Sequence, residues 1–417
     1  MILKRWHIYF LSLIIYAFDF ATLLPFSIPA LGSLSLGKIL MIVSLMIEIG
    51  QFILIRHGRF SIVGVKILSP ILFILWFVFL SVFWSLEIGS ALRYLFIYLF
   101  NFIALFISFI TIRQAGLSSF WNLVRSIAWI SVIFAIFDWA YGIRPIISRQ
   151  YSFANSVVGI YPNSITLGFV LSAFVPATLM FFINGSIIRI RDLILTLAII
   201  LLLPSIGSRT ALIACLITIL ATYVVQIRRI SFTYILAAAL TVIGALNFNI
   251  FLSVAPIPYA VVEKLQTIPA ILSGDDVLTQ SARALAIESG LEKLSERPLI
   301  GYGAGAVEII YSDIPELLAE GNVNAHNWWM ECLINGGIIL FSAFLYLYTF
   351  ILINILRLAR ASNHRGVIFS VAFTLAFPLL SFGPGSLINV PFTWIVIGGV
   401  LGIIYLSRLQ NMPKGNI

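Results

Sequence analysis

Charged residues are scarce in this sequence. Asp, Glu, Lys and Arg make up 10% of its 417 residues, whereas apolar residues make up 61%. A soluble domain usually has about a quarter charged residues, so this composition excludes an ordinary soluble protein. There are only two cysteines, Cys215 and Cys332, and both fall inside apolar runs, so we expect no disulfide. No D-x-D pair occurs, and we find no internal repeat.

Long apolar runs dominate the chain instead. A helix that crosses a bilayer needs about 20 apolar residues, and twelve runs are candidates. They lie at 8–28, 36–55, 67–84, 91–112, 121–141, 163–184, 191–206, 209–227, 231–250, 327–356, 367–382 and 388–407. The first could mimic a signal peptide, but it reaches spanning length and we predict a helix. The sequence thus predicts an all-α, polytopic membrane protein with about 12 transmembrane helices.

Basic residues predict the orientation, because cytoplasmic loops retain Lys and Arg. With the N-terminus inside, sixteen basic residues fall on the cytoplasmic side. Five fall at the outer loops and helix ends, namely Lys38, Arg93, Arg144, Arg149 and Arg209. We therefore expect a multi-pass membrane protein with both termini in the cytoplasm.

The composition changes once, at residues 251–325, which hold ten acidic and four basic residues. This predicts three parts: transmembrane helices in 1–250, a periplasmic loop domain in 251–326, and transmembrane helices in 327–417. Within the loop, residues 281–297 have helical spacing of apolar residues and end before Pro298. The net positive charge of the chain outside this segment reflects arginines that face the membrane and not nucleic-acid binding.

Several basic side chains gather at the predicted outer face. Arg209 directly opens a predicted helix after a short Ser-Gly turn, Arg93 lies in the first turn of another, and Arg283 lies on the loop helix. Helix N-termini attract anions, and a guanidinium grips phosphate in a bidentate manner. The pattern favours a diphosphate ligand, although Arg93 and Arg149 could equally be interfacial anchors.

His326 stands where the polar loop meets the next apolar run. It could be an interfacial anchor like Trp328 and Trp329. Beside cations and a helix N-terminus, however, an imidazole stays neutral and can accept a proton. Without a D-x-D pair or a carboxylate cluster, we expect no metal and no cofactor, with arginine charge stabilising the leaving group.

Short motifs resemble the O-antigen ligase and Wzy-type polymerase superfamily. They are Phe83-Trp84-Ser85 with Arg93, Tyr161-Pro162-Asn163-Ser164, Ser208-Arg209-Thr210-Ala211, the Arg283 helix leading into Arg297-Pro298-Leu299-Ile300-Gly301-Tyr302-Gly303, Ala325-His326-Asn327-Trp328-Trp329, and Leu333-Ile334-Asn335-Gly336-Gly337.

The resemblance implies a GT-C-like, all-helical glycosyltransferase of the bacterial inner membrane, with its active site facing the periplasm. It implies that the enzyme uses undecaprenyl-diphosphate-linked glycans without metal. His326, Arg209 and Arg283 are the expected catalytic residues. The expected substrate-binding residues are Arg144, Arg93, Asn327, Asn163 and Tyr302. The expected partners are the lipid-linked donor, membrane lipids, and lipid A–core or a second lipid-linked glycan as acceptor.

Three alternatives remain beside the preferred O-antigen ligase. A Wzy-type polymerase shares the chemistry and differs only in the acceptor. A glycan flippase would have about twelve spans, but transporters usually have related halves and midplane charges. Asp19, Glu48, Asp138 and Glu331 could mark such a path, yet we interpret them as interhelical hydrogen-bond partners. A purely structural subunit offers no reason for outer arginines.

Overall fold

The structure is a computed structural model. It describes residues 5–18, 26–28, 32–55, 62–142, 157–161, 164–175, 177–178, 190–206, 211, 214–216, 218–219, 282–315, 327–362, 364–381 and 386–410. The chain forms two compact units. Unit 1 comprises Met1–Leu123, Asp276–Asn354 and Pro384–Ile417, and unit 2 comprises Val124–Asp275 and Ile355–Gly383. The three-part division by chain order, at 250 and 326, stays a prediction.

Long apolar helices confirm the prediction of a mainly helical membrane protein. Among the described residues, five helices are long and apolar enough to cross a membrane. These spans are Gly64–Trp84, Ile88–Ala115, Leu117–Tyr141, Trp328–Ala361 and Pro391–Leu409. They coincide with five of the predicted runs. The count of twelve and the periplasmic placement of the loop stay predictions.

The first predicted span, 8–28, is wrong at its C-terminal end, where the structure has a strand. Helix α1 (Arg5–Ala17) ends well before residue 28, and strand β1 (Phe26–Ile28) pairs in antiparallel fashion with β2 (Gly32–Leu34). In the sequence, β1 lies between Pro25 and Pro29. Proline cannot donate the helical hydrogen bond and disfavours helix in the residue before it. Helix α2 (Leu36–Ile55) then follows as predicted.

Helices α4 (Ile88–Ala115) and α18 (Pro391–Gln410) form the core of unit 1. They approach so closely that a Cβ at Gly398 would lie 2.1 Å from the carbonyl oxygen of Leu105. Buried polar side chains join the same helices, since Ser108 donates to the carbonyl oxygen of Ile395 at 2.7 Å. Small residues and interhelical hydrogen bonds are the usual means by which helices associate in lipid, where there is no hydrophobic driving force between them.

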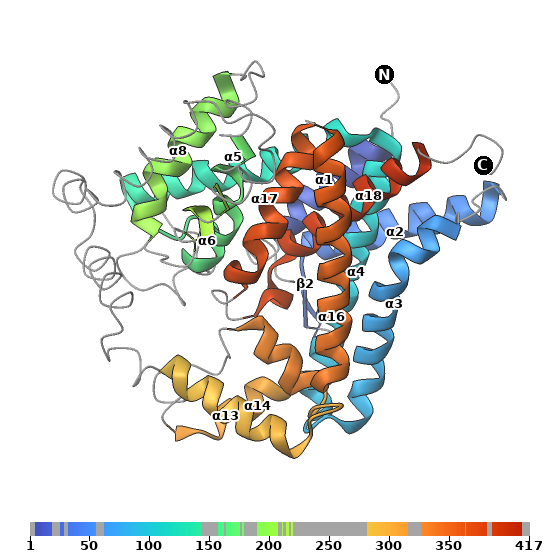
Figure 1. Ribbon diagram of the computed structural model, residues 1–417, viewed down its shortest axis with the longest axis vertical. Helices are drawn as coiled ribbons and strands as arrows, with labels where there is room; N and C mark the ends of the chain where they lie inside the picture. The colour runs from blue at the N-terminus through green and yellow to red at the C-terminus, as the bar shows by residue number, and fades with distance from the viewer. Residues whose placement is uncertain are drawn as a thin grey trace. The chain divides into compact units, whose positions relative to one another are not determined.

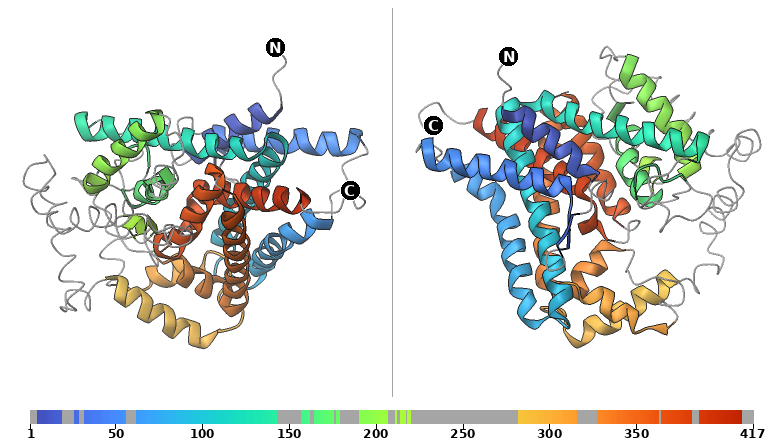
Figure 2. Two further views of the ribbon diagram at one scale, coloured as in Figure 1. Left: turned by 45° about the horizontal axis from the view of Figure 1, so that its top comes forward. Right: turned by 180° about the vertical axis from the view of Figure 1, so that it is seen from behind.

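Two short helices of unit 1, α13 (Ala282–Glu296) and α14 (Ala306–Ser312), lie at one end of its long helices. Helix α3 (Ile62–Ser81) leads through η1 (Val82–Trp84) into α4, while α13 and α14 precede α16 (Trp328–Ala361); η4 (Leu387–Asn389) precedes α18. Figure 1 shows α13 and α14 beside the ends of α3, α4 and α16, and the view from behind in Figure 2 agrees.

Helix α13 confirms the helix predicted over 281–297 and turns an unexpected side to the core. Ala286 and Gly290 face inward, and a Cβ at Gly290 would lie 2.8 Å from the Tyr311 hydroxyl. The larger Ile287 and Leu291 are exposed. Small residues therefore make the closest contact, Leu285 packs beside them, and Ile287 and Leu291 point outward.

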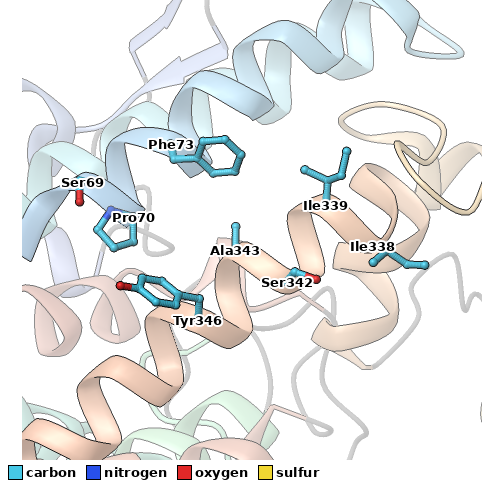
Figure 3. Close-up of a pocket in the computed structure, with 8 residues that line it drawn as sticks. All are labelled: Ser69, Pro70, Phe73, Ile338, Ile339, Ser342, Ala343 and Tyr346. Carbon is cyan, nitrogen blue, oxygen red and sulfur yellow. The ribbon is translucent and has the colours of Figure 1, made fainter.

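An apolar groove runs between α3 and α16 (Figure 3). Its volume is about 570 Å³, and Pro70 and Phe73 on α3 face Ile339, Ala343 and Tyr346 on α16. The exposed fractions of Phe73 and Tyr346 are 43% and 60%. Because both helices are of membrane-spanning character, the groove is a place where a lipid chain can lie against the protein.

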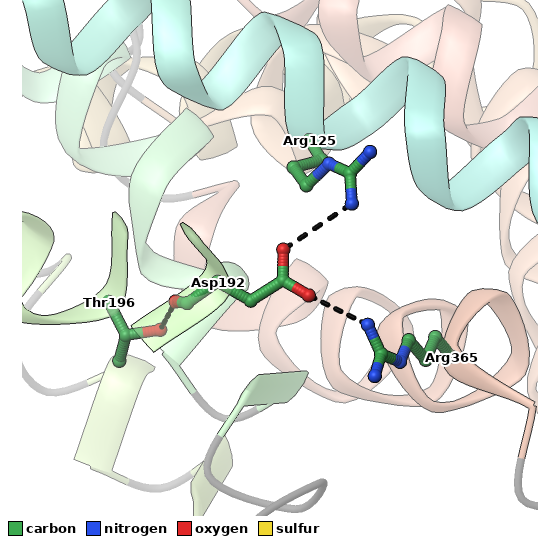
Figure 4. Close-up of polar contacts among 4 residues, drawn as sticks. All are labelled: Arg125, Asp192, Thr196 and Arg365. Atoms are coloured by element: carbon green, nitrogen blue, oxygen red, sulfur yellow. Dashed lines mark hydrogen bonds and ion pairs between the residues drawn. The ribbon is translucent and has the colours of Figure 1, made fainter. Parts of the chain in front are cut away.

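Unit 2 is organised around a buried carboxylate. It contains the end of α5 (Leu117–Tyr141), α6 (Ser164–Ser172), α8 (Ile190–Ile206) and α17 (Arg365–Leu380), so the two shortest predicted runs are helices. Asp192 on α8 is 1% exposed and pairs with Arg125 of α5 at 3.4 Å and Arg365 of α17 at 2.7 Å (Figure 4). One carboxylate thus ties three helices together.

Replacing Asp192 should destabilise the protein strongly. Asp192→Asn removes the charge that pairs with Arg125 and Arg365, and breaking a buried ion pair costs about 3–5 kcal/mol. We expect a clearly lower unfolding temperature for the purified protein in detergent. Glu292→Gln, on the exposed side of α13, is the control and should unfold like the parent. Equal unfolding temperatures for Asp192→Asn and the parent would show that the pair does not stabilise the fold.

Candidate functional site

Helix α16 is broken near its start, and a loop fills the break. Gly337 has φ 61° and ψ −161°, which is incompatible with a helix. The amides of Ile338 and Ile339 donate to the carbonyl oxygens of Pro298 and Leu299, at 2.8 and 3.2 Å. Conversely, the carbonyl oxygens of two residues before the break accept from the loop: Ile334 from Tyr302 and Asn335 from Gly303, both at 2.9 Å.

These four bonds replace two bonds of a regular helix. In an unbroken helix, residue 338 would donate to 334 and residue 339 to 335. Here residues 297–305, which we call the glycine loop, satisfy all four groups. An unsatisfied backbone group is costly in apolar surroundings, so a break is tolerated only where protein supplies the missing partners. Two of the sequence motifs, 297–303 and 333–337, are therefore bonded to each other through their backbones.

The turn between α3 and α4 also contacts the glycine loop. Ser85 donates to the carbonyl oxygen of Ala304 at 3.0 Å, and the amide of Ala304 donates to the Ser81 hydroxyl at 3.2 Å. Trp84 donates from its indole to the carbonyl oxygen of Ile300 at 3.3 Å. The Phe83-Trp84-Ser85 motif thus contacts the glycine loop, which in turn pairs with the 333–337 motif, although more than 200 residues separate Trp84 and Ser85 from the loop in sequence.

Asn327 caps the first turn of α16. Its side-chain oxygen accepts from the amides of Trp329 and Met330, at 3.1 and 3.3 Å, and Asn327 is buried. Such a cap satisfies amides that have no partner within the helix. The contact fixes the backbone immediately after His326. Whether Asn327 also binds substrate stays a prediction.

Glu331 lies one turn further along α16 and is 1% exposed. Its Oε1 accepts from Ser386 at 2.8 Å, whereas no hydrogen bond reaches its Oε2 from the described part of the chain. Glu48 accepts from Tyr9 and Gln114, and Asp138 accepts from the amides of Val158 and Gly159. Glu48 is therefore an interhelical hydrogen-bond partner, as predicted, whereas Asp138 and Glu331 bind residues that lie outside the helices; Asp19 lies outside the described residues.

Tyr302 is held by the end of α13. Its hydroxyl donates to Glu296 Oε2 at 2.5 Å, and Arg297 lies over its ring at 5.0 Å. Burial, together with this bond, raises the pKa of Tyr302. The bond from Tyr302, with a second from Lys293, lowers the pKa of Glu296. The hydroxyl therefore remains a donor engaged within the protein, and substrate binding by Tyr302 stays a prediction.

Arg93 is the predicted outer-face arginine that the structure describes in full. It lies near the start of α4, with Nη1 at 3.5 Å from Glu308 Oε2 on α14, and its side chain is 64% exposed. Tyr94 donates to the other oxygen of Glu308 at 3.1 Å. Sequence reasoning did not single out Glu308. Its only signal was its place in the first turn of a helix directly after the glycine loop.

The other predicted site residues cannot be placed against this geometry. His326, Arg209, Arg144, Asn163 and Arg149 lie outside the described residues. Arg283 lies in the first turn of α13, where its backbone alone is described. In unit 2, Tyr161 of the Tyr161-Pro162-Asn163-Ser164 motif is buried, and its hydroxyl lies 2.9 Å from that of Ser131.

The break in α16 should tolerate no side chain at Gly337. A Cβ there would lie 2.3 Å from the backbone of Leu299, and non-glycine residues in this backbone region cost about 1–3 kcal/mol before any clash. We expect Gly337→Ala to lower the unfolding temperature. Gly50→Ala is the matched control, because no atom lies within 4 Å of a Cβ built there. Unchanged unfolding of Gly337→Ala would contradict a tightly packed break.

Comparison with known proteins agrees with these motifs. The family model described as O-antigen ligase matches residues 194–345. This range contains Arg209, Arg283, the glycine loop, His326 and the broken part of α16. No curated protein matches the chain in sequence. The family match confirms the resemblance seen in the motifs, and residues 194–345 are similar to the O-antigen ligase family.

Proposed function

We propose that the protein is an O-antigen ligase-like glycosyltransferase of the bacterial inner membrane. It transfers a glycan from undecaprenyl diphosphate to a sugar hydroxyl of lipid A–core at the periplasmic face. The observation that carries the proposal is the family match over 194–345, which spans the predicted base and two predicted diphosphate ligands. The meeting of three motifs next to the start of α16 supports a built site there.

The reaction is a single displacement at the anomeric carbon. The acceptor hydroxyl attacks that carbon while His326 takes its proton. The bond to the diphosphate oxygen breaks, and the undecaprenyl diphosphate leaves with the electron pair. Arg209 and Arg283 stabilise the charge that develops on it, so no metal is required. Attack from the face opposite the leaving group inverts the anomeric centre.

Two structural features support this arrangement. Asn327 fixes the chain direction right after His326, and the helix start adds a positive dipole end near the site. The groove between α3 and α16 begins at Ile338, directly after the break, and has the apolar lining that an isoprenoid chain requires. A Wzy-type polymerase would use the same groups with a second lipid-linked glycan as acceptor.

Substitution of His326 separates a base from an anchor. An anchor needs only amphipathic bulk, which His326→Gln keeps, whereas losing a general base typically costs about 10²–10⁴ in rate. We expect His326→Gln to fold normally but to lose glycan transfer from undecaprenyl diphosphate to lipid A–core. Gel analysis of the reaction product measures this transfer. EDTA should leave the parent unaffected. Full transfer by His326→Gln would remove the base, and inhibition by EDTA would reopen a metal mechanism.

Arg209→Lys tests the diphosphate ligand. Lysine keeps the charge but loses the bidentate fork. We expect donor use to fall at least about tenfold, a loss of roughly 1.4 kcal/mol in transition-state stabilisation. Arg149→Lys, predicted to change only an anchor, is the control. Parent-like turnover of a well-expressed Arg209→Lys protein would reduce Arg209 to an anchor as well.

The orientation has its own test. Cysteines introduced at positions 275 and 313 should react with a membrane-impermeant thiol reagent in cells with a permeabilised outer membrane, because both positions are predicted to be periplasmic. A cysteine at position 228 should stay unlabelled. The reverse labelling pattern would place the predicted site on the wrong side of the membrane.

A further inference from the structure

A small polar groove lies between the start of α4 and α14. It encloses about 300 Å³, and its lining includes Glu87, Gly89, Ser90, Arg93, Glu308 and Ser312. All of these residues belong to unit 1. The groove lies next to the glycine loop, since Ser90 donates to the carbonyl oxygen of Gly305 at 3.2 Å. The groove is therefore fixed to the same framework as the broken helix.

Glu308 presents one carboxylate oxygen to the groove. Its Oε1 is held by the hydroxyl of Tyr94, which is 1% exposed, while its Oε2 faces Arg93. At 3.5 Å and with the Arg93 side chain 64% exposed, this ion pair contributes little to stability. The buried tyrosine aims the carboxylate, and the exposed guanidinium leaves donors available to a ligand.

The charges in the groove select the chemistry of its ligand. Arg93 can only donate hydrogen bonds, and the carboxylates of Glu87 and Glu308 can only accept them. One cation against two anions repels a diphosphate, which was the ligand expected for Arg93 from sequence. A hydroxyl group both donates and accepts, so neighbouring hydroxyls can bridge Arg93 and Glu308.

We infer that this groove is a sugar-binding subsite, in which Arg93 and Glu308 recognise hydroxyl groups of a glycan. The inference rests on the proposed function, because the glycan is that of the donor or that of the acceptor. Gly89 keeps the groove open: a Cβ there would already lie 3.7 Å from Glu87 Oε1, and a larger side chain would occupy the space.

Binding of water-soluble sugars to the purified full-length protein tests the subsite without turnover. The probes are the repeat-unit oligosaccharide released from its polyprenyl diphosphate, the core oligosaccharide released from lipid A, and inorganic pyrophosphate. Gly89→Leu fills the groove, and Glu308→Gln removes the charge while keeping the shape. The matched controls are Gly50→Leu, where a Cβ has no atom within 4 Å, and Glu288→Gln on the exposed side of α13.

We expect both groove variants to weaken binding of one oligosaccharide by about tenfold or more, with pyrophosphate binding unchanged and both controls like the parent. The oligosaccharide affected identifies the source as donor or acceptor. Parent-like sugar binding by Gly89→Leu, or no sugar binding by the parent, would overturn the subsite. Pyrophosphate binding that Gly89→Leu abolishes would also overturn it and assign the groove to diphosphate.

A transfer assay with the lipid-linked donor distinguishes failure of the subsite from failure of the proposed function. A parent that transfers glycan, with a Gly89→Leu variant that binds both oligosaccharides normally, would remove the subsite alone. A parent that binds an oligosaccharide through the groove but transfers no glycan would remove the proposed reaction and leave the subsite.

Discussion

Four main-chain hydrogen bonds between the glycine loop and the break in α16 hold one end of unit 1 together. A helix that stops inside an apolar environment exposes amides and carbonyl oxygens that water cannot reach. The loop supplies a partner for each of them, and glycine at 301 and 337 lets the two backbones approach. A Cβ at Gly301 would lie 2.4 Å from the carbonyl oxygen of Ile334.

Three neighbouring elements, α13, α14 and the turn before α4, are connected to the glycine loop. The glycine loop leads from α13, which carries Arg283, into α14, which carries Glu308. It also accepts hydrogen bonds from Trp84 and Ser85, in the turn that leads into α4, and α4 carries Arg93 near its start. The side-chain oxygen of Asn335, beside the break, accepts from the amide of Val307 at 3.2 Å and so orients α14. The loop therefore positions charged groups that it does not itself contain.

Polar side chains elsewhere serve the packing of helices. Asn101 accepts a hydrogen bond from the Tyr16 hydroxyl and donates one to the carbonyl oxygen of Ile388. Asp192 forms ion pairs with two arginines. A chain of such groups near the bilayer midplane would favour a transporter. In the described residues, Glu48 joins three helices, whereas Asp138 accepts from the amides of residues 158 and 159 and Glu331 from the Ser386 hydroxyl before η4, so all three serve contacts within the protein.

The sequence by itself determined the membrane class, the positions of most of the described helices and the resemblance to the O-antigen ligase family, because spanning length, turn residues and short motifs are local properties. Its failure at 8–28 has the same origin: hydropathy counts apolar residues and overlooks the two prolines that flank β1. Only the tertiary structure decided what the motifs touch. Gly301 packs against the backbone at the break in α16, and Gly337 packs against the backbone of the glycine loop. Asn327 caps a helix, and Arg93 faces Glu308. Partners more than 200 residues apart are chosen by how helices pack, and no local pattern contains that information.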